Sequence, residues 1–276
     1  MGKLSLFWLF TAVGMAGTIN IGFESPDYFP GNINMQQGWS NTGNFDAQVT
    51  SAAGYGGSQS MRISNGISSG AYGNQPFTPH LLIPAGESSI PGAVDTFYSS
   101  WYFKSVTGQL QDGLKVTVSA DSGVGTRMTY LRMADDAVNG MNLQFYDFGG
   151  TPENFQYQML VTHLDRTVWH RIDMNIYFVD GPGNDGVQIF LDGQLLVNGT
   201  TWEDYSRSIS PGLLPPVNSL LFRAGDEPAV PSTLGAGFYI DDISLTSLDA
   251  PEPDALRLAL AGLLSLLAYR LGRICA

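Results

Sequence analysis

The chain has 276 residues, of which 43% are apolar and 12% aromatic, and it carries a formal net charge of −12 at pH 7. A chain of this length can bury a sizeable core within one domain. Its acidic surface repels phosphate backbones, so no nucleic-acid partner is expected. The charge suits a soluble extracytoplasmic protein, divalent cations or neutral glycans, and the alternative is that it serves solubility alone. The single cysteine, Cys275, leaves the rest of the chain without disulfides, a thiolate nucleophile or a cysteine-based zinc site.

Residues 1–16 have the order of features typical of a secretory signal peptide. Lys3 precedes an apolar run from Leu4 to Val13, and the small residues Gly14 and Ala16 fit cleavage after Ala16. The run is too short for a membrane-spanning helix. The alternative is a buried strand or helix at the start of the fold. We therefore expect an exported protein whose mature chain begins at residue 17.

Residues 17–249 consist of β-rich runs separated by Gly, Asn, Asp and Pro turn signals. Helical periodicity is scarce and no repeat is visible. About a dozen strands in a segment of this size predict an all-β fold, an antiparallel β-sandwich of the jelly-roll kind. The expected strands cover residues 18–24, 45–51, 58–64, 97–106, 114–120, 127–134, 141–148, 155–163, 169–179, 186–199, 219–225 and 238–247.

Alternation within two of these runs indicates which side chains are buried. Along residues 169–179, apolar side chains fall on one face and polar side chains on the other, as expected for a half-buried strand. Within residues 186–199, Asp192 and Gly193 predict a hairpin turn. Trp101 is also expected in the core. The predicted inward positions are Ile172, Met174, Ile176, Phe178, Val187, Ile189 and Leu191.

A resemblance supports this fold class. Residues 167–205, TVWHRIDMNIYFVDGPGNDGVQIFLDGQLLVNGTTWEDY, are followed by SLLFRAGDE and GFYIDDISL. Together they resemble the concanavalin A-like lectin/glucanase group, the laminin-G-like jelly rolls, over most of residues 95–247. The resemblance implies the fold. It implies no single activity, because this fold hosts binding proteins, hydrolases and lyases alike.

The first and last strands suggest a calcium site. Residues 22–24 and 238–245 are expected to belong to paired strands, an arrangement similar to carbohydrate-binding modules with structural calcium. For Ile240 and Ile243 both to be buried, the last strand needs a bulge at Asp241 and Asp242. Glu24 beside Asp241 then offers oxygen ligands of the kind that Ca²⁺ takes. The alternative is two solvated carboxylates.

The sequence patterns that would indicate a catalytic site are weaker than those that indicate the fold. The Glu-x-Asp-x-x-Glu strand of a retaining glucanase does not occur, and the adjacent acids Glu203-Asp204 and Asp226-Glu227 are expected in turns. A polysaccharide lyase needs a charge neutraliser, a base and an acid on one face. The alternative for such residues is the polar outer face of each strand. Residues of the right types are His170, Arg171, Tyr130, Arg132, Asn142, Gln144 and Tyr146.

Carbohydrate binding requires fewer specific residues than catalysis, because exposed aromatic faces with polar groups around them suffice. Trp202, in the loop NGTTWEDYSR, is the best candidate for an exposed aromatic side chain. The alternative is that it packs beneath that loop. The predicted carbohydrate-binding residues are Trp202, Tyr205, Tyr130, Arg132 and Tyr146.

Residues 250–276 form a distinct terminal segment. Pro251-Glu252-Pro253 precedes an apolar run from Leu256 to Leu271, and the basic residues Arg270 and Arg273 lie near its end. This order resembles the PEP-CTERM sorting signal. The resemblance implies a Gram-negative bacterium that makes exopolysaccharide, and an exosortase-type enzyme that recognises and processes the tail. The run is short for a transmembrane helix, which suits a temporary hold in the membrane better than a permanent anchor.

The sequence thus predicts three parts: a signal peptide (1–16), a β-sandwich (17–249) and a sorting segment (250–276). The expected role is a non-catalytic, carbohydrate-binding protein of the cell envelope or of the exopolysaccharide matrix. Two alternatives stay open, a polysaccharide lyase or hydrolase and a structural matrix protein without a ligand site.

Overall fold

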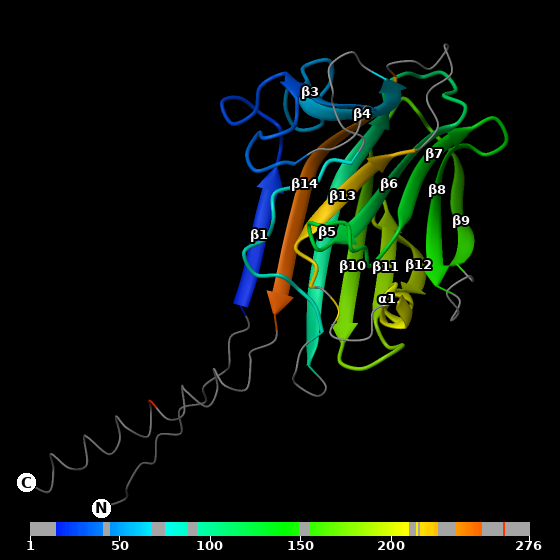
Figure 1. Ribbon diagram of the computed structural model, residues 1–276. Coiled ribbons are helices and arrows are strands. Elements are labelled where there is room, and N and C mark those ends of the chain that lie inside the picture. Colours follow the sequence, from blue (N-terminus) through cyan, green and yellow to red (C-terminus); the bar gives the residue numbers. More distant parts are fainter. Residues whose placement is uncertain are drawn as a thin grey trace, which may run out of the picture.

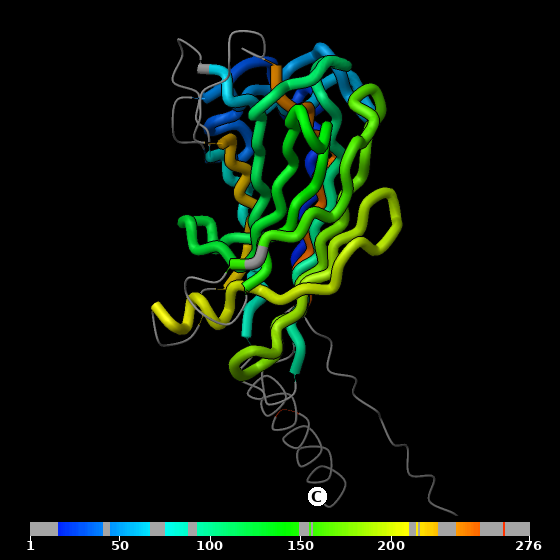
Figure 2. The backbone as a smooth tube through the Cα atoms, turned by 90° about the vertical axis from the view of Figure 1, so that its right-hand side faces the viewer, coloured from blue at the N-terminus to red at the C-terminus, as the bar shows by residue number. Residues whose placement is uncertain are grey.

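The computed structural model describes residues 15–40, 45–67, 75–87, 93–148, 155–209, 214, 216–225, 236–249 and 262. Figures 1 and 2 show two β-sheets that lie face to face as two layers. The strands are β1 (Met15–Ile21), β2 (Gly31–Asn32), β3 (Phe45–Thr50), β4 (Ser60–Ile67), β5 (Val94–Ser105), β6 (Leu114–Asp121), β7 (Leu131–Asp136), β8 (Gly140–Phe148), β9 (Phe155–Leu164), β10 (His170–Val179), β11 (Gly186–Leu191), β12 (Gln194–Thr200), β13 (Ser219–Ala224) and β14 (Phe238–Asp249).

Both sheets are antiparallel. The larger sheet has nine strands in the order β12-β11-β10-β5-β14-β4-β3-β2, with β1 paired to β14, and the smaller has five in the order β13-β6-β7-β8-β9. This architecture confirms the predicted all-β antiparallel sandwich. Figure 1 places β3 and β4 at one end of the sandwich and the start of β1 at the other.

The core fills the space between the two sheets. In β10, inward Ile172, Met174, Ile176 and Phe178 are buried while the alternate residues are more exposed, as predicted. Trp101 is fully buried, and its ring meets Phe222 of the opposite sheet at 6.0 Å between centroids and 82° between planes. The predicted turn is also confirmed, since Asp192 and Gly193 both have positive φ (50° and 83°) and join β11 to β12.

The last strand contains the predicted bulge. The register between β14 and β5 shifts between Asp241 and Ser244, and Asp242 has a φ of 45°. As a result Ile240 and Ile243 are both buried, at 0% and 1% exposed. A bulge has therefore moved one side chain out of the alternation so that two apolar neighbours face the core.

The first strand pairs with the last strand, but it ends earlier than predicted. Met15 to Ile21 pair with Asp249 to Ile243 in β14. Residues 22–24 are not strand, because Phe23 takes a φ of 58°, a left-handed conformation that ends the pairing and buries its ring. The expectation of a strand through Glu24 was wrong.

One short helix was not predicted. The helix α1 (Glu203–Ile209) follows β12, and Figure 1 shows it toward the end of the sandwich where β1 begins. The hydroxyl of Thr201 accepts the backbone N–H of Glu203 at 3.2 Å, and the carbonyl of Trp202 accepts that of Ser206 at 2.9 Å. Acidic residues in its first turn and Arg207 in its last turn suit the helix dipole.

The two predicted terminal segments lie mostly outside the described residues. Residues 1–14 are outside them, and so are Pro251, Glu252, Pro253, Arg270 and Arg273 of the sorting motif. The predicted cleavage position after Ala16 falls inside β1, so residues 17–21 would keep their pairing with β14. Within the described part of the chain, no helix is long and apolar enough to span a membrane.

Candidate functional site

The outer face of the five-stranded sheet gathers polar and aromatic side chains. In β7 and β8, buried apolar residues alternate with residues that point away from the core. The cross-strand register aligns Arg223 with Thr117, Thr117 with Arg132, and Arg132 with Gln144. These side chains form one row across β13, β6, β7 and β8.

An aromatic cluster lies beside this row. Trp202 stacks on Tyr130, with ring centroids 5.6 Å apart and planes 6° apart. Tyr146 contacts Tyr130 at 5.0 Å and Tyr157 at 4.6 Å, both edge to face. The members of this aromatic cluster are Tyr130, Tyr146, Phe148, Phe155, Tyr157, Trp202 and Tyr205.

All five residues predicted to bind carbohydrate are therefore brought together. Tyr130, Tyr146, Trp202 and Tyr205 belong to the aromatic cluster, and Arg132 packs against it. The sequence reasoning missed Phe148, Phe155 and Tyr157, although they lie in predicted strands. They were missed because Tyr157 lies opposite Tyr146 only through the register between β8 and β9, which the sequence does not specify.

Trp202 is half-buried, between the two sequence-based expectations for it. Its indole Nε1–H donates to the carbonyl of Tyr146 at 3.1 Å, and its backbone N–H donates to the carbonyl of Met128 at 2.9 Å. Phe155 covers part of the ring at 4.6 Å between centroids. The position of the ring is consequently fixed before any ligand arrives.

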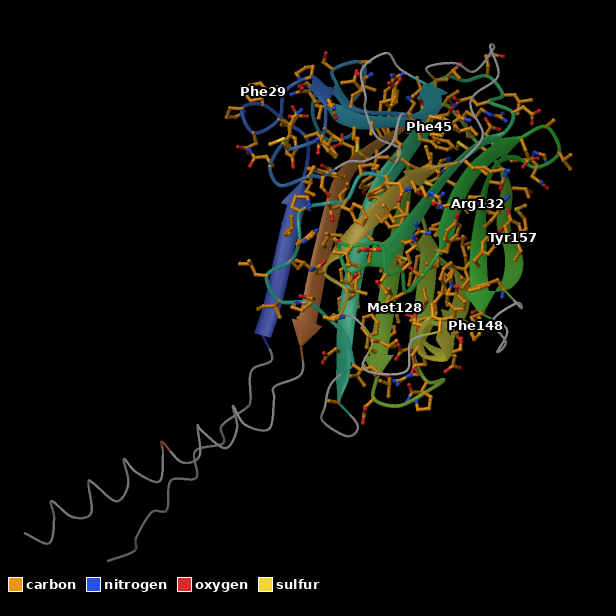
Figure 3. The ribbon with its side chains drawn as sticks, in the orientation of Figure 1. Phe29, Phe45, Met128, Arg132, Phe148 and Tyr157 are labelled. Atoms are coloured by element: carbon orange, nitrogen blue, oxygen red, sulfur yellow. The ribbon has the colours of Figure 1, made fainter. Side chains whose placement is uncertain are left out.

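Arg132 is held by phenol rings instead of a carboxylate. Its guanidinium carbon lies 5.7, 5.1 and 5.6 Å from the ring centroids of Tyr130, Tyr146 and Tyr157. Nη1 donates to the Tyr157 hydroxyl over 3.4 Å, and Nε has no hydrogen-bond partner among the described residues. Figure 3 shows Arg132 and Tyr157 near one another, with Phe148 farther down the same side of the molecule.

The charge states follow from these contacts. Burial disfavours the charge of Arg132, but a hydrogen bond to Tyr130 and the neighbouring phenols outweigh it and raise its pKa. Burial also raises the pKa of Tyr157, against the opposing effect of Arg132. At neutral pH the guanidinium is therefore charged and the phenol is protonated, so both serve as hydrogen-bond donors.

Two hollows flank the stacked rings. The first, called the cationic pocket, has a volume of about 230 Å³ and is lined by Lys115, Thr117, Tyr130, Arg132 and Arg223, with Gly113, Ala224 and Gly225. The second, the tryptophan hollow, has a volume of about 300 Å³, and Arg127, Trp202, Tyr205 and Ile209 are among its lining residues. The stack joins the two, because Tyr130 lines the first hollow and Trp202 the second.

The residues considered for a lyase are divided between the two sheets. Arg132 and Tyr146 lie on the five-stranded sheet and Tyr130 directly precedes its strand β7, whereas His170 and Arg171 lie on β10 of the other sheet. His170 bonds through Nδ1 to Asp192 at 2.9 Å and through Nε2 to the carbonyl of Asp165 at 3.0 Å, so both ring nitrogens have structural partners. Asn142 and Gln144 do share the outer face of β8 and bond to each other at 2.6 Å.

Of the two adjacent acid pairs noted in the sequence, the structure describes only Glu203-Asp204. Asp226 and Glu227 lie outside the described residues. Glu203 is buried at the start of α1, where it accepts from Arg207 Nε at 2.7 Å. Asp185 is buried near it, and burial, with the charge of Glu203 as a smaller cause, raises the pKa of Asp185 to about 7.

The two predicted calcium ligands hold one loop. Glu24 accepts the backbone N–H groups of Ser58 and Gln59 at 2.8 and 2.9 Å. Asp241 accepts the N–H of Tyr55 at 2.7 Å. The N–H of Gln59 lowers the pKa of Glu24, whereas burial, helped by nearby acids, raises that of Asp241 to about 6.

These carboxylates fit a cation only in part. They converge on the loop of residues 55–59, but their oxygens already accept hydrogen bonds from it. Among the residues that the structure describes, no group of three or more His, Cys, Asp or Glu side chains is placed to hold a metal ion. Calcium binding at Glu24 and Asp241 stays a prediction.

Comparison with known proteins finds solved structures of similar fold but no similar sequence. No family model matches the chain, and no curated protein matches it. Similar solved structures include a cellulose-induced protein, Cip1, at 16% identity and a TM-score of 0.44, covering 82% of this chain and 96% of that one.

Two further structures are similar to about the same degree. The alginate lyase Aly36B, in complex with an alginate trisaccharide, has 9% identity and a TM-score of 0.47, over 83% of this chain and 97% of the other. The winged bean acidic lectin, complexed with methyl-α-D-galactose, has 12% identity and a TM-score of 0.41, over 86% and 100%. These identities and scores are too low to transfer an activity or a site.

Proposed function

We propose that this protein binds carbohydrate, without catalysis, on the outer face of its five-stranded sheet. The observation that carries the proposal is the stack of Trp202 on Tyr130, which lies between the cationic pocket and the tryptophan hollow. Sugar rings bind to aromatic surfaces through their C–H faces while polar groups around them bond the hydroxyls. The stack supplies the aromatic surface, and Thr117, Arg132 and Arg127 supply hydrogen-bonding groups on either side.

The surroundings of the site favour binding over catalysis. The described lining of both hollows contains no histidine and no carboxylate. Tyr157 keeps its proton at neutral pH because its pKa is raised, which disfavours it as a general base. A lyase or hydrolase, and a matrix protein without a ligand site, are the alternatives that the experiment below distinguishes.

The proposed place of action is the cell envelope or extracellular polysaccharide matrix of a Gram-negative bacterium. The signal-peptide pattern of residues 1–16 and the Pro251-Glu252-Pro253 tail support export and processing by an exosortase-type enzyme. The apolar run would hold the protein in the membrane until the tail is processed. Extracellular polysaccharide would then be the partner of the sandwich.

Calorimetric titration and a glycan array test the proposal on the exported protein. Trp202→Ala should weaken the affinity for any bound glycan at least tenfold. Trp169→Ala is the matched control, since Trp169 also packs between tyrosines but precedes β10 on the other sheet. Failure of the native protein to bind any glycan would overturn the proposal. Unsaturated or reducing-end products from a polysaccharide panel would assign an enzyme instead.

A further inference from the structure

We infer that the cationic pocket selects an acidic sugar, so that the glycan bound by this protein is an anionic polysaccharide. The inference rests on the proposed carbohydrate binding and names the class of its ligand. It differs from what the net charge of the chain suggests, because an acidic surface repels anions on average.

The basic side chains of the chain are few and unevenly placed. Of its 13 Lys and Arg, four lie outside residues 17–249 (Lys3, Arg257, Arg270 and Arg273), which leaves nine in the sandwich. Three of these nine, Lys115, Arg132 and Arg223, line the same pocket. The described lining of the pocket thus carries three basic side chains and no acidic one, in a chain of charge −12.

The fold concentrates these charges around one small residue. Thr117 lies between Arg132 and Arg223 in the cross-strand register, and Lys115 follows the same face of β6. Strands lie about 4.8 Å apart, so the backbones that carry the two arginines are separated by roughly 10 Å. The short side chain of Thr117 leaves the space between them open.

A glycine leaves room for the lysine at the edge of the pocket. A Cβ at Gly225 would lie 3.2 Å from the Cβ of Lys115 and 3.3 Å from its carbonyl oxygen. The absence of a side chain at Gly225 therefore lets the stem of Lys115 lie along the rim of the pocket.

Other arginines of the sandwich have a different environment. Arg62, Arg166, Arg171 and Arg207 each form an ion pair with a carboxylate of the described residues. Arg132 forms no such pair there, and three phenol rings surround its guanidinium instead. Lys115 and Arg132 line the pocket together, and neither forms an ion pair within the described residues. Like charges repel one another, and a bound anion relieves that repulsion. The planar guanidinium also matches a carboxylate in a two-bond geometry.

The neighbouring surface suits a chain of sugars. A pocket of about 230 Å³ is below the usual ~300–1,000 Å³ range of drug-sized ligands, so it suits one charged sugar unit. From that unit the glycan would continue over Tyr130 and Trp202 into the tryptophan hollow, where Arg127 lies.

The test compares acidic oligosaccharides with their uncharged methyl esters. Oligomers of galacturonate, glucuronate and alginate are titrated into the exported protein, each beside its methyl ester, together with a sulfated dextran and neutral glucans. We expect at least one uronate oligomer to bind at least tenfold more tightly than its ester. If the sulfated dextran alone binds in a Lys115-dependent way, the pocket still selects an anion, and that anion is a sulfate ester.

Variants assign the preference to the pocket. Lys115→Met should reduce the ratio of acid to ester affinity severalfold without a change in melting temperature, because Lys115 is exposed. Arg132→Lys should keep a preference for the acid, and Arg132→Met should lose it. Lys104→Met removes the same charge from β5 on the other sheet and should leave the ratio unchanged.

The outcomes separate this inference from the proposed function. Equal binding of acid and ester, or a preference that Lys115→Met leaves intact, would overturn the inference while carbohydrate binding stands. No binding to any acidic or neutral glycan would overturn both.

Discussion

Trp202 and Tyr130 lie in parallel, with ring planes 6° apart, and their contact joins the segment before α1 to the segment before β7. The ring of Trp202 is also held by a hydrogen bond, because its indole N–H donates to the carbonyl of Tyr146 at 3.1 Å. A binding surface that is ordered in advance loses less conformational entropy when a ligand binds. The stack is therefore ordered in advance of the glycan that we propose it binds.

The indole hydrogen bond should make a measurable contribution. Trp202→Phe keeps an aromatic ring on Tyr130 but removes the N–H, leaving the carbonyl of Tyr146 without this donor. We expect the free energy of unfolding to fall by about 1 kcal/mol. Glycan affinity should fall less than in Trp202→Ala. Urea denaturation and calorimetric titration of the two variants check this, and equal affinities in both would contradict it.

Asp185 should make the protein more stable in mild acid than in base. It is 4% exposed, and its pKa is raised to about 7 in the folded protein. Unfolded aspartate ionises near pH 4, so the folded state alone keeps the proton between about pH 4 and 7. The free energy of unfolding should then decrease as pH rises through this window, by a few kcal/mol at about 1.4 kcal/mol per pKa unit.

Asp185→Asn should remove that pH dependence. The amide oxygen can still accept the N–H of Val179, and the amide nitrogen can donate to the hydroxyl of Thr201. The variant should be more stable than the native protein at pH 8 and similar at pH 4.5, by urea denaturation. Asp180→Asn, an exposed acid of the same loop, is the control that should change neither value.

Calcium should stabilise the loop held by Glu24 and Asp241. At neutral pH these two acids and Asp242 lie near one another, and the charges of Glu24 and Asp242 help to raise the pKa of Asp241. A bound Ca²⁺ would neutralise this repulsion. We expect millimolar calcium to raise the melting temperature and EDTA to reverse the rise. Glu24→Gln should abolish the effect, and an unchanged melting temperature in the native protein would refute the calcium site.

Processing should leave both sheets of the sandwich paired. Cleavage after Ala16 removes two residues of β1 and leaves Gly17 to Ile21 paired with Ser247 to Ile243. Removal of the tail beyond Asp249 removes none of β14. The intact mass of the exported protein should therefore correspond to a chain that begins at Gly17 and lacks Cys275. A mature chain that still contains Cys275 would argue for a plain membrane anchor.

Local patterns in the sequence were enough to predict most strands. The alternation of β10, the Asp192-Gly193 turn and the bulge after Ile240 each depend on neighbours in sequence, and each was found. The helix α1 was missed because seven residues give too little periodicity, and its capping residue Thr201 lies in a stretch rich in turn formers.

The candidate site could be predicted only in part. The types of its aromatic residues were visible, but the cationic pocket combines Lys115, Arg132 and Arg223 from three strands. Their meeting depends on the register between strands, which no local pattern specifies. The net charge of the chain also concealed it, because an average over the surface says nothing about a local concentration of one sign.

The pairing of residues 17–21 of β1 with the end of β14 has a mechanical consequence. The end of β14 has hydrogen-bonded partners on both sides, β1 and β5. If the five-stranded sheet is bound to polysaccharide, tension applied through the C-terminus would act along β14. It would load these hydrogen bonds in shear. Bonds loaded in shear must break together, whereas a peeled edge strand loses them one at a time. A protein held from this strand would thus resist pulling without a disulfide.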